Sequence, residues 1–273
     1  MHPIICKIGP FTVYSYGVMM ALAVVVCARL LSKDAVKLKL KPEIVFDLVF
    51  WVVCAGILGA RIFYVFLNLD YFWKNPVEII QIQNGGLAWQ GGLVAGMATG
   101  ILYIRQHALP LGKTLDLAAP YIALGPTIGR IGCFLNGCCY GKEVSWGIYF
   151  PIYHARLHPT QLYESVSLFF IFLILTGLNR NSFNEQRPVL TTNIFRKVSK
   201  KYQQSNQVPG RVFIAYLFLA SLERFVVEFF RADHLTTWLG LSIFQWVSLI
   251  VMSSAFYAYT VIKSRFRKES AAP

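Results

Sequence analysis

Long apolar stretches alternate with short polar ones along this chain, and the pattern predicts helices that cross a membrane. A spanning helix needs about 20 mostly apolar residues. The predicted spans are Phe11–Leu31, Ile44–Leu69, Leu87–Ile104, Thr114–Leu135, Gln161–Leu178, Arg211–Phe230 and Leu241–Ile262. The fourth is the least apolar, because it contains Asp116, two prolines and Arg130. The N-terminal residues lack the basic start and small-residue cleavage site of a signal peptide, so we expect the first span to be retained.

The overall composition agrees with a membrane protein. The chain has 273 residues, of which 56% are hydrophobic and 14% charged, whereas soluble domains carry about 25% charged residues. The formal net charge is +13, which in a soluble protein would indicate nucleic acid. Here the basic residues lie mostly between apolar stretches, so orientation in the membrane explains them better. We expect no nucleic-acid partner.

The distribution of lysine and arginine predicts the topology. Of the 26 basic residues, 18 lie in alternate connections that would face one side or at the span ends beside them, five face the other side, and three lie deeper within spans. Cytoplasmic loops carry such an excess of positive charge. We therefore expect an all-α membrane protein, a single polytopic domain over 1–273, with seven transmembrane helices, a periplasmic N-terminus and a cytoplasmic C-terminus. The polar, basic stretch at about 179–210 is expected to be a cytoplasmic loop.

Three arginines lie inside predicted spans, at similar depth near the outer face: Arg61, Arg130 and Arg224. Charged groups within a span are costly and usually functional. Glu228 follows Arg224 by one helical turn, and Glu164 opens the fifth span from the same side. Each arginine by itself suits a structural ion pair or a side chain that reaches the membrane surface. Three together favour an anion site, and the planar guanidinium group suits the phosphate of a phospholipid.

Further polar and small residues open the neighbouring spans from the same side. Tyr16 opens the first span and Gln90 the third. Gly92, Gly96 and Gly100 recur every four residues after Gln90. This spacing is typical of close helix packing in membranes.

Six sequence blocks resemble the prolipoprotein diacylglyceryl transferases, over nearly the whole chain. The signature block reads GRIGCFLNGCCYG, from Gly129 to Gly141. The other five blocks are YSYGVMMAL near the start, GARIFYV at Gly59–Val65, GGLAWQGGLVAG at Gly85–Gly96, HPTQLYES at His158–Ser165 and ERFVVEFFR at Glu223–Arg231. Six blocks in the family's order are a specific match, whereas a lone GRIG would not be.

The resemblance implies a transferase of the bacterial inner membrane. It would move the diacylglyceryl group of phosphatidylglycerol onto the lipobox cysteine of a prolipoprotein signal peptide. It implies that Arg130 binds the lipid phosphate, that Arg224 acts at the transition state, that Tyr16 helps form the headgroup pocket and that Glu228 orients Arg224. Gln90 occupies a catalytic position of the family. The residues expected to contact substrate, besides Arg130, are Arg61, Asn136, Gly129, Gly91, Gly92, His158 and Glu164.

The chain departs from the family pattern at three positions. The family often has histidine where this chain has Gln90, asparagine at Cys133 and glutamate at Cys138. Glutamine cannot act as a base, so the group that deprotonates the substrate thiol stays open. His158 and Tyr16 are the substitutes that position suggests. A divergent, non-catalytic protein that binds or moves lipid is the alternative.

Three of the six cysteines cluster in the signature block: Cys133, Cys138 and Cys139. A disulfide from Cys133 to either neighbour is one option, and a thiol oxidoreductase is a third functional class. A zinc site is less favoured, because a tetrahedral zinc site requires four ligands. We expect no metal and no cofactor.

Overall fold

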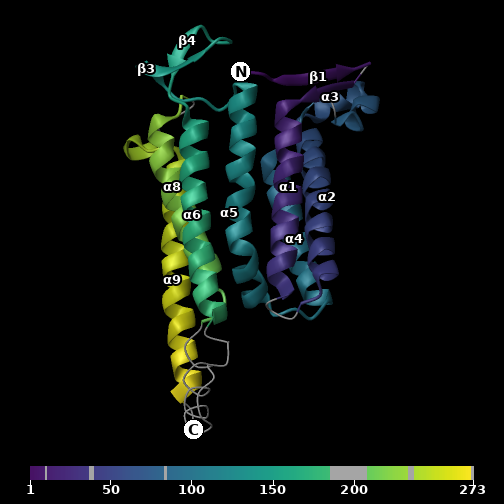
Figure 1. The fold of residues 1–273 in the computed structure, drawn as a ribbon. Coiled ribbons are helices and arrows are strands. Elements are labelled where there is room, and N and C mark those ends of the chain that lie inside the picture. The colour runs from purple at the N-terminus through teal and green to yellow at the C-terminus, as the bar shows by residue number, and fades with distance from the viewer. Residues whose placement is uncertain (10, 37–39, 83–84, 185–207, 233–236, 272–273) are drawn as a thin grey trace. The chain divides into compact units, whose positions relative to one another are not determined.

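A computed structural model describes residues 1–9, 11–36, 40–82, 85–184, 208–232 and 237–271. Long helices make up most of these residues (Figure 1). The chain divides into two compact units: one is formed by Leu31–Thr114, and the other by Met1–Leu30 with Leu115–Pro273.

The unit Leu31–Thr114 is built on a helix pair, α2 (Pro42–Leu67) and α4 (Trp89–Gln106). A short helix α3 (Leu69–Lys74) and a 3₁₀ turn η2 (Pro76–Ile79) follow α2. A Cβ atom added at Gly91 would overlap the backbone of Gly59, and one added at Gly92 would lie 3.1 Å from the Gly56 carbonyl oxygen. Gly91 and Gly92 therefore let the two backbones touch. An added Cβ at Gly92, Gly96 or Gly100 would lie 3.1–3.6 Å from atoms of α2, which confirms the close packing predicted for these three glycines.

The other unit contains α1 (Ser15–Ala35) as far as Leu30, most of α5 (Leu111–Asn136), α6 (Thr160–Asn184), α8 (Arg211–Val227) and α9 (Ile243–Ala271). Small and branched apolar side chains from α5, α6 and α8 form its buried core. They are Ala119, Ala123, Leu168, Ile171, Leu175 and Val212. The alanines on α5 let the bulkier side chains of α6 and α8 approach closely.

Asp116, the acidic residue that weakened the fourth predicted span, has a structural role. Its carboxylate accepts hydrogen bonds from the backbone N–H groups of Gly210 (2.7 Å) and Phe213 (2.9 Å) at the start of α8. The first N–H groups of a helix lack partners within the helix, and a carboxylate there also suits the helix dipole. The Asn179 side chain donates to the Asp116 carbonyl oxygen (2.7 Å), so this capping group ties α5, α6 and α8 together.

Two short antiparallel hairpins were not predicted. β1 (Ile4–Ile8) pairs with β2 (Phe11–Tyr14), and β3 (Glu143–Phe150) pairs with β4 (Ala155–Leu157). The first predicted span therefore starts too early, because Phe11–Tyr14 is a strand and the helix begins at Ser15. Hydropathy alone cannot separate a short apolar strand from the first turn of an apolar helix.

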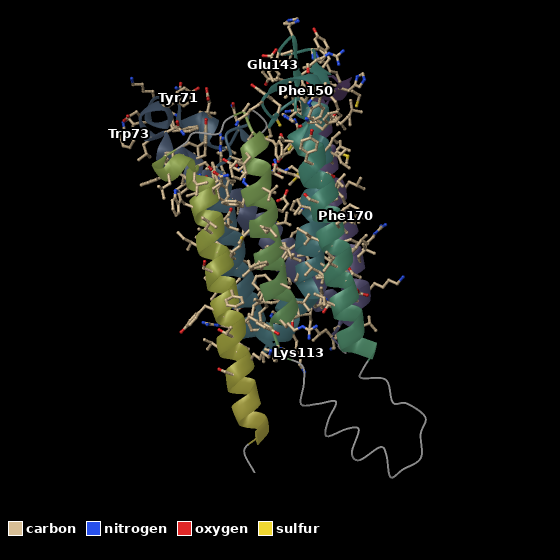
Figure 2. All side chains as sticks on the ribbon, turned by 90° about the vertical axis from the view of Figure 1, so that its left-hand side faces the viewer. Tyr71, Trp73, Lys113, Glu143, Phe150 and Phe170 are labelled. Carbon is tan, nitrogen blue, oxygen red and sulfur yellow. The ribbon has the colours of Figure 1, made fainter. Side chains whose placement is uncertain are left out.

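Each of the seven predicted spans coincides with a long helix in the described part of the chain. Among the described residues, four helices are long and apolar enough to cross a membrane: α1, α2, α6 and α9. Large apolar side chains project from them, such as Phe170 on α6, which is 58% exposed (Figure 2). Lipid contact accounts for such a surface better than water does. Most of the predicted polar loop at 179–210 lies outside the described residues.

Candidate active site

The centre of the candidate site is the carboxylate of Glu164, which lies in the second turn of α6 and is 2% exposed. It forms an ion pair with Nε of Arg130 on α5. It also lies 3.5 Å from Nη1 of Arg224 on α8 and 3.3 Å from Nη1 of Arg231. One buried carboxylate thus gathers three guanidinium groups, one from α5 and two from the segment Glu223–Arg231.

A second buried carboxylate, that of Glu228, supports the same arginines. Glu228 lies 2.8 Å from Nη2 of Arg224 and 4.0 Å from Nε of Arg231. It also accepts a hydrogen bond from the Ser242 hydroxyl (3.0 Å). Because Glu164 and Glu228 bind different nitrogens of Arg224, they fix the plane of its guanidinium group.

The backbone around Arg231 explains how this residue turns back to the site. The α-helix α8 ends at Val227, and a 3₁₀ turn, η4 (Glu228–Phe230), follows it. An isolated antiparallel bridge pairs Arg231 with Gly141, and the Lys142 N–H donates to the Phe230 carbonyl oxygen (2.8 Å). The last residue of the signature block therefore holds the chain segment that carries Arg231. Arg231 was not among the predicted site residues, because it falls after the predicted span.

Gly141 has no room for a side chain. A Cβ atom there would overlap the Phe230 carbonyl oxygen and would lie 2.6 Å from His158 Cβ and 2.7 Å from Thr160 Cγ2. Three chain segments meet at this point, and only glycine lets them come together.

The signature loop between α5 and Gly141 is fixed by side chains from the start of α6. The Gln161 side chain donates to the Cys138 carbonyl oxygen (2.5 Å), and the Thr160 hydroxyl donates to that of Cys139 (2.8 Å). Both donors are fully buried. Asn136 is the last residue of α5, where this loop begins, and its contact with substrate stays a prediction.

Tyr16 and Gly129 lie where α1 meets α5. A Cβ atom at Gly132 would lie 3.3 Å from Tyr16 Cα, and one at Gly129 would lie 3.2 Å from Met20 Sδ. Tyr16 is also within electrostatic reach of Arg130 and of the signature cysteines. Tyr16 therefore lies on the part of α1 that packs against α5, and its place in a headgroup pocket stays a prediction.

His158 lies in an aromatic enclosure outside the helices. Its ring contacts those of Trp146, Tyr163 and Phe230 at centroid distances of 4.8, 5.9 and 5.4 Å. Its Nδ1 lies 3.1 Å from the Tyr163 hydroxyl. Burial lowers the pKa of His158, and the positive charge of Lys142 lowers it further, so the neutral imidazole is favoured at pH 7.

The other predicted site residues, Gln90, Gly91, Gly92 and Arg61, belong to the unit Leu31–Thr114. Gly91 and Gly92 face α2, and Gln90 is exposed at the start of α4. The Arg61 guanidinium donates to five backbone carbonyl oxygens, those of Glu78, Ile79, Gln81, Gly85 and Gly86, at 2.5–3.4 Å. This arginine holds the turn that leads into α4, and its contact with substrate stays a prediction.

We call the group formed by Arg130, Arg224 and Arg231 with Glu164 and Glu228 the arginine cluster. Its exposed edge is made of arginine. The side chains of Arg130 and Arg224 are each 26% exposed, whereas those of Glu164 and Glu228 are 3% and 1% exposed. A third carboxyl group, that of Glu223, accepts a hydrogen bond from the Ser167 hydroxyl (3.1 Å). The buried carboxylates hold the two guanidinium groups from behind, and the accessible edge suits a phosphate.

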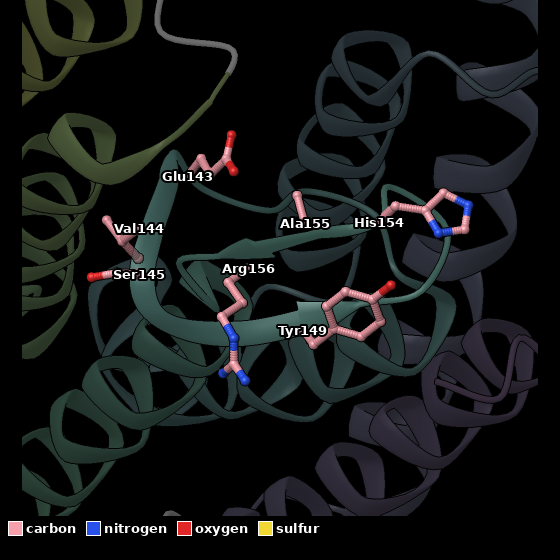
Figure 3. Close-up of a pocket in the computed structure, with 7 residues that line it drawn as sticks. All are labelled: Glu143, Val144, Ser145, Tyr149, His154, Ala155 and Arg156. Atoms are coloured by element: carbon pink, nitrogen blue, oxygen red, sulfur yellow. The ribbon is translucent and has the colours of Figure 1, made fainter.

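A separate open pocket lies on the β3–β4 hairpin (Figure 3). Its lining comes entirely from this hairpin and its turn: Glu143, Val144, Ser145, Tyr149, His154, Ala155 and Arg156. None of these residues belongs to the arginine cluster. We place the candidate active site at the cluster, because its guanidinium groups are accessible and suit a phosphate.

Comparison with known proteins points to one family. The family model described as prolipoprotein diacylglyceryl transferase matches residues 3–261. Enzymes named phosphatidylglycerol–prolipoprotein diacylglyceryl transferase are among the similar proteins. That of Bacillus mycoides is 35% identical, over 84% of this chain and 80% of its own length. That of Clostridium tetani is 29% identical over 98% of this chain and all of its own length.

Proposed function

Because the chain belongs to the prolipoprotein diacylglyceryl transferase family, we propose that it transfers the diacylglyceryl group of phosphatidylglycerol to the lipobox cysteine of prolipoproteins. The thiol sulfur attacks the glyceryl carbon that carries the phosphate. A carbon–sulfur bond forms, the carbon–oxygen bond to phosphate breaks, and glycerol phosphate leaves with the electron pair. The observation that carries this proposal is the accessible guanidinium pair of Arg130 and Arg224 above buried Glu164.

The arginine cluster supplies what this reaction needs. Negative charge accumulates on the leaving phosphate as the carbon–oxygen bond breaks, and fixed donors in a water-poor site stabilise that charge. In this mechanism Arg130 binds the phosphate through the nitrogens that Glu164 does not engage. Arg224, held by Glu164 and Glu228, stabilises the developing charge. Arg231 is a positioning residue, because it acts through the same two carboxylates.

The substrate thiol must lose its proton before it attacks. Gln90 cannot accept a proton, and the two substitutes are His158 and Tyr16. The His158 ring is enclosed by Trp146, Tyr163 and Phe230, whereas Tyr16 lies within electrostatic reach of Arg130. We assign the headgroup side of the site to Tyr16, which as a neutral phenol does not take up the thiol proton. A neutral imidazole can accept a proton, so His158 stays the candidate acceptor.

The membrane topology belongs to the same proposal. Seven helices with the N-terminus in the periplasm and the C-terminus in the cytoplasm would place the arginine cluster near the outer face of the bacterial inner membrane. Phospholipid phosphates and exported prolipoproteins are both present at that depth. The alternation of basic loops in the sequence supports this orientation.

A direct assay tests the proposal. The purified protein is incubated with phosphatidylglycerol and a lipobox peptide, and the peptide is weighed by mass spectrometry. We expect a thioether-linked diacylglyceryl peptide and release of glycerol phosphate. A protein that binds phosphatidylglycerol but leaves the peptide unmodified would instead be a non-catalytic lipid-binding protein.

A further inference from the structure

Three thiols meet at the end of α5. The Sγ atoms of Cys133, Cys138 and Cys139 all lie within 4.8 Å of one another. Cys133 is buried, and the other two are partly buried. We propose that these three cysteines bind one closed-shell, thiophilic cation, Zn²⁺ or Cu⁺. This inference revises the expectation from sequence that the chain holds no metal, and it does not depend on the transfer reaction.

The backbone holds the three thiols in place without a metal. Buried Gln161 and Thr160 bind the carbonyl oxygens of Cys138 and Cys139. The Cys138 N–H donates to the Cys133 carbonyl oxygen (3.2 Å). Cys139 adopts a positive φ of 61°, which residues other than glycine rarely do and which often marks a functional site. The Cys138 thiol also donates to the Cys133 carbonyl oxygen (3.7 Å). These contacts hold the three sulfur atoms close together.

The spacing of the sulfur atoms suits a metal better than a disulfide. Zinc–sulfur bonds are about 2.3 Å, so two thiolates of a tetrahedral site lie about 3.8 Å apart. Sulfur atoms within 4.8 Å of one another reach that spacing with shifts of about 1 Å or less. A disulfide brings two sulfur atoms to about 2.05 Å and leaves the third thiol unpaired. Three equivalent soft donors are the ligand set that Zn²⁺ and Cu⁺ prefer.

The charges around the cluster also favour a metal–thiolate complex. Three thiolates with Zn²⁺ carry a net charge of −1, and with Cu⁺ a net charge of −2. The guanidinium groups of Arg130 and Arg231 both act electrostatically on Cys139. Zn²⁺ would take water as its fourth ligand, whereas Cu⁺ accepts three ligands. The metal would fix the loop that leads to Gly141 and so would stabilise the fold.

Metal binding is tested on the purified full-length protein. The protein is reduced, incubated anaerobically with Zn²⁺ or with Cu⁺, and freed of excess metal before elemental analysis. We expect one Zn²⁺ or one Cu⁺ per chain and a higher melting temperature than that of the metal-free protein. With Cd²⁺ as a probe, the thiolate-to-metal charge-transfer band should report three thiolates.

Two variants make the test specific. The variant Cys133→Ser/Cys138→Ser/Cys139→Ser should bind less than a tenth of the metal and lose the thermal shift. The matched control Cys6→Ser/Cys27→Ser/Cys54→Ser should keep both. If the triple variant misfolds, Cys139→Ser alone should still lower the thiolate count. Three results would each overturn the proposal. The wild-type protein could bind neither metal, the two triple variants could bind metal equally, or the reduced, metal-treated protein could contain a disulfide within the cysteine cluster.

Discussion

Arg130 on α5 forms an ion pair with Glu164 on α6, and this carboxylate is almost completely buried. The pair joins the signature block of the chain to the start of the next helix. Arg224 and Arg231 also lie within 3.5 Å of Glu164. The two catalytic arginines of our proposal therefore share this acidic residue, and Glu228 holds Arg224 as well.

Glu164→Gln should reduce both stability and transfer. Removing one partner of a buried ion pair typically costs about 3–5 kcal/mol, because the remaining charges stay buried without compensation. We expect a lower melting temperature together with a lower rate of thioether formation. Glu43→Gln, at an exposed position in the first turn of α2, is the matched control and should behave like the wild-type protein. Equal melting temperatures and rates for the two variants would show that Glu164 does not organise the cluster.

Gly141→Ala should destabilise the protein at the meeting point of three segments. The added Cβ would overlap the Phe230 carbonyl oxygen, and forcing extra atoms into packed sites costs about 1–3 kcal/mol or more. The control is Gly177→Ala in α6, where a Cβ meets nothing within 4 Å. Alanine there should be neutral or slightly stabilising, since glycine disfavours helix interiors. Thermal unfolding measures both, and unchanged stability of Gly141→Ala would contradict the described bridge to Arg231.

Acidification should destabilise the enclosure around His158. Burial, and then the charge of Lys142, lowers the pKa of His158 in the folded protein, whereas the unfolded chain titrates near about 6.5. Below that pH the unfolded state binds the proton more readily, so stability falls as pH falls toward the folded-state pKa.

The measurement compares melting temperatures between about pH 7.5 and pH 5.5, a range that brackets the unperturbed pKa of histidine. The wild-type protein should lose more stability over this range than His158→Gln, which has no titratable group at this position. Parallel pH profiles for the two proteins would mean that His158 is not held in its neutral form.

Reporter fusions test the orientation of the chain. Fusions after Lys41 and Lys201 should report the cytoplasm, and fusions after Asn75 and Glu143 should report the periplasm, because basic loops stay inside. A cytoplasmic signal after Glu143 would move the arginine cluster to the wrong side of the membrane for exported prolipoproteins.

Much of the helical framework followed from the sequence, because the lengths of apolar stretches limit where helices can form. The ends of the helices were predicted less accurately. Phe11–Tyr14 pairs as a strand with Ile4–Ile8, although its hydropathy continues that of α1. Asp116 looked like a defect in a span, but its carboxylate caps the N-terminus of α8. A contact between positions 94 residues apart leaves no local signal in the sequence.

The site was predicted only in part, because contacts between distant positions also decide which residues gather there. Arg130, Arg224, Glu164 and Glu228 stood out because ionisable residues are rare inside apolar stretches. Arg231 was missed, since it follows the span and only the bridge to Gly141 turns it inward. Arg61 met the same sequence criterion as Arg130, yet its donors bind backbone carbonyl oxygens. A charged position inside an apolar stretch can be recognised from sequence, but the partner of its side chain cannot.

The phosphate-binding role of Arg130 and Arg224 is tested most directly by lysine substitution. Lysine keeps the positive charge but loses the planar, two-pronged donor. Removing a donor that stabilises the transition state typically lowers the rate by about 10²–10³. Arg61→Lys should be milder, because Arg61 holds a turn. Arg105→Lys, at an exposed position near the end of α4, is the control for a neutral exchange.

The measurement is the rate of thioether formation on a lipobox peptide in nanodiscs containing phosphatidylglycerol, with membrane insertion of every variant checked independently. We predict that Arg130→Lys and Arg224→Lys each lower this rate by at least about 10²-fold, while Arg105→Lys retains the wild-type rate. Near-normal rates in both Arg130→Lys and Arg224→Lys would contradict the account, since the two arginines would then supply only positive charge or packing.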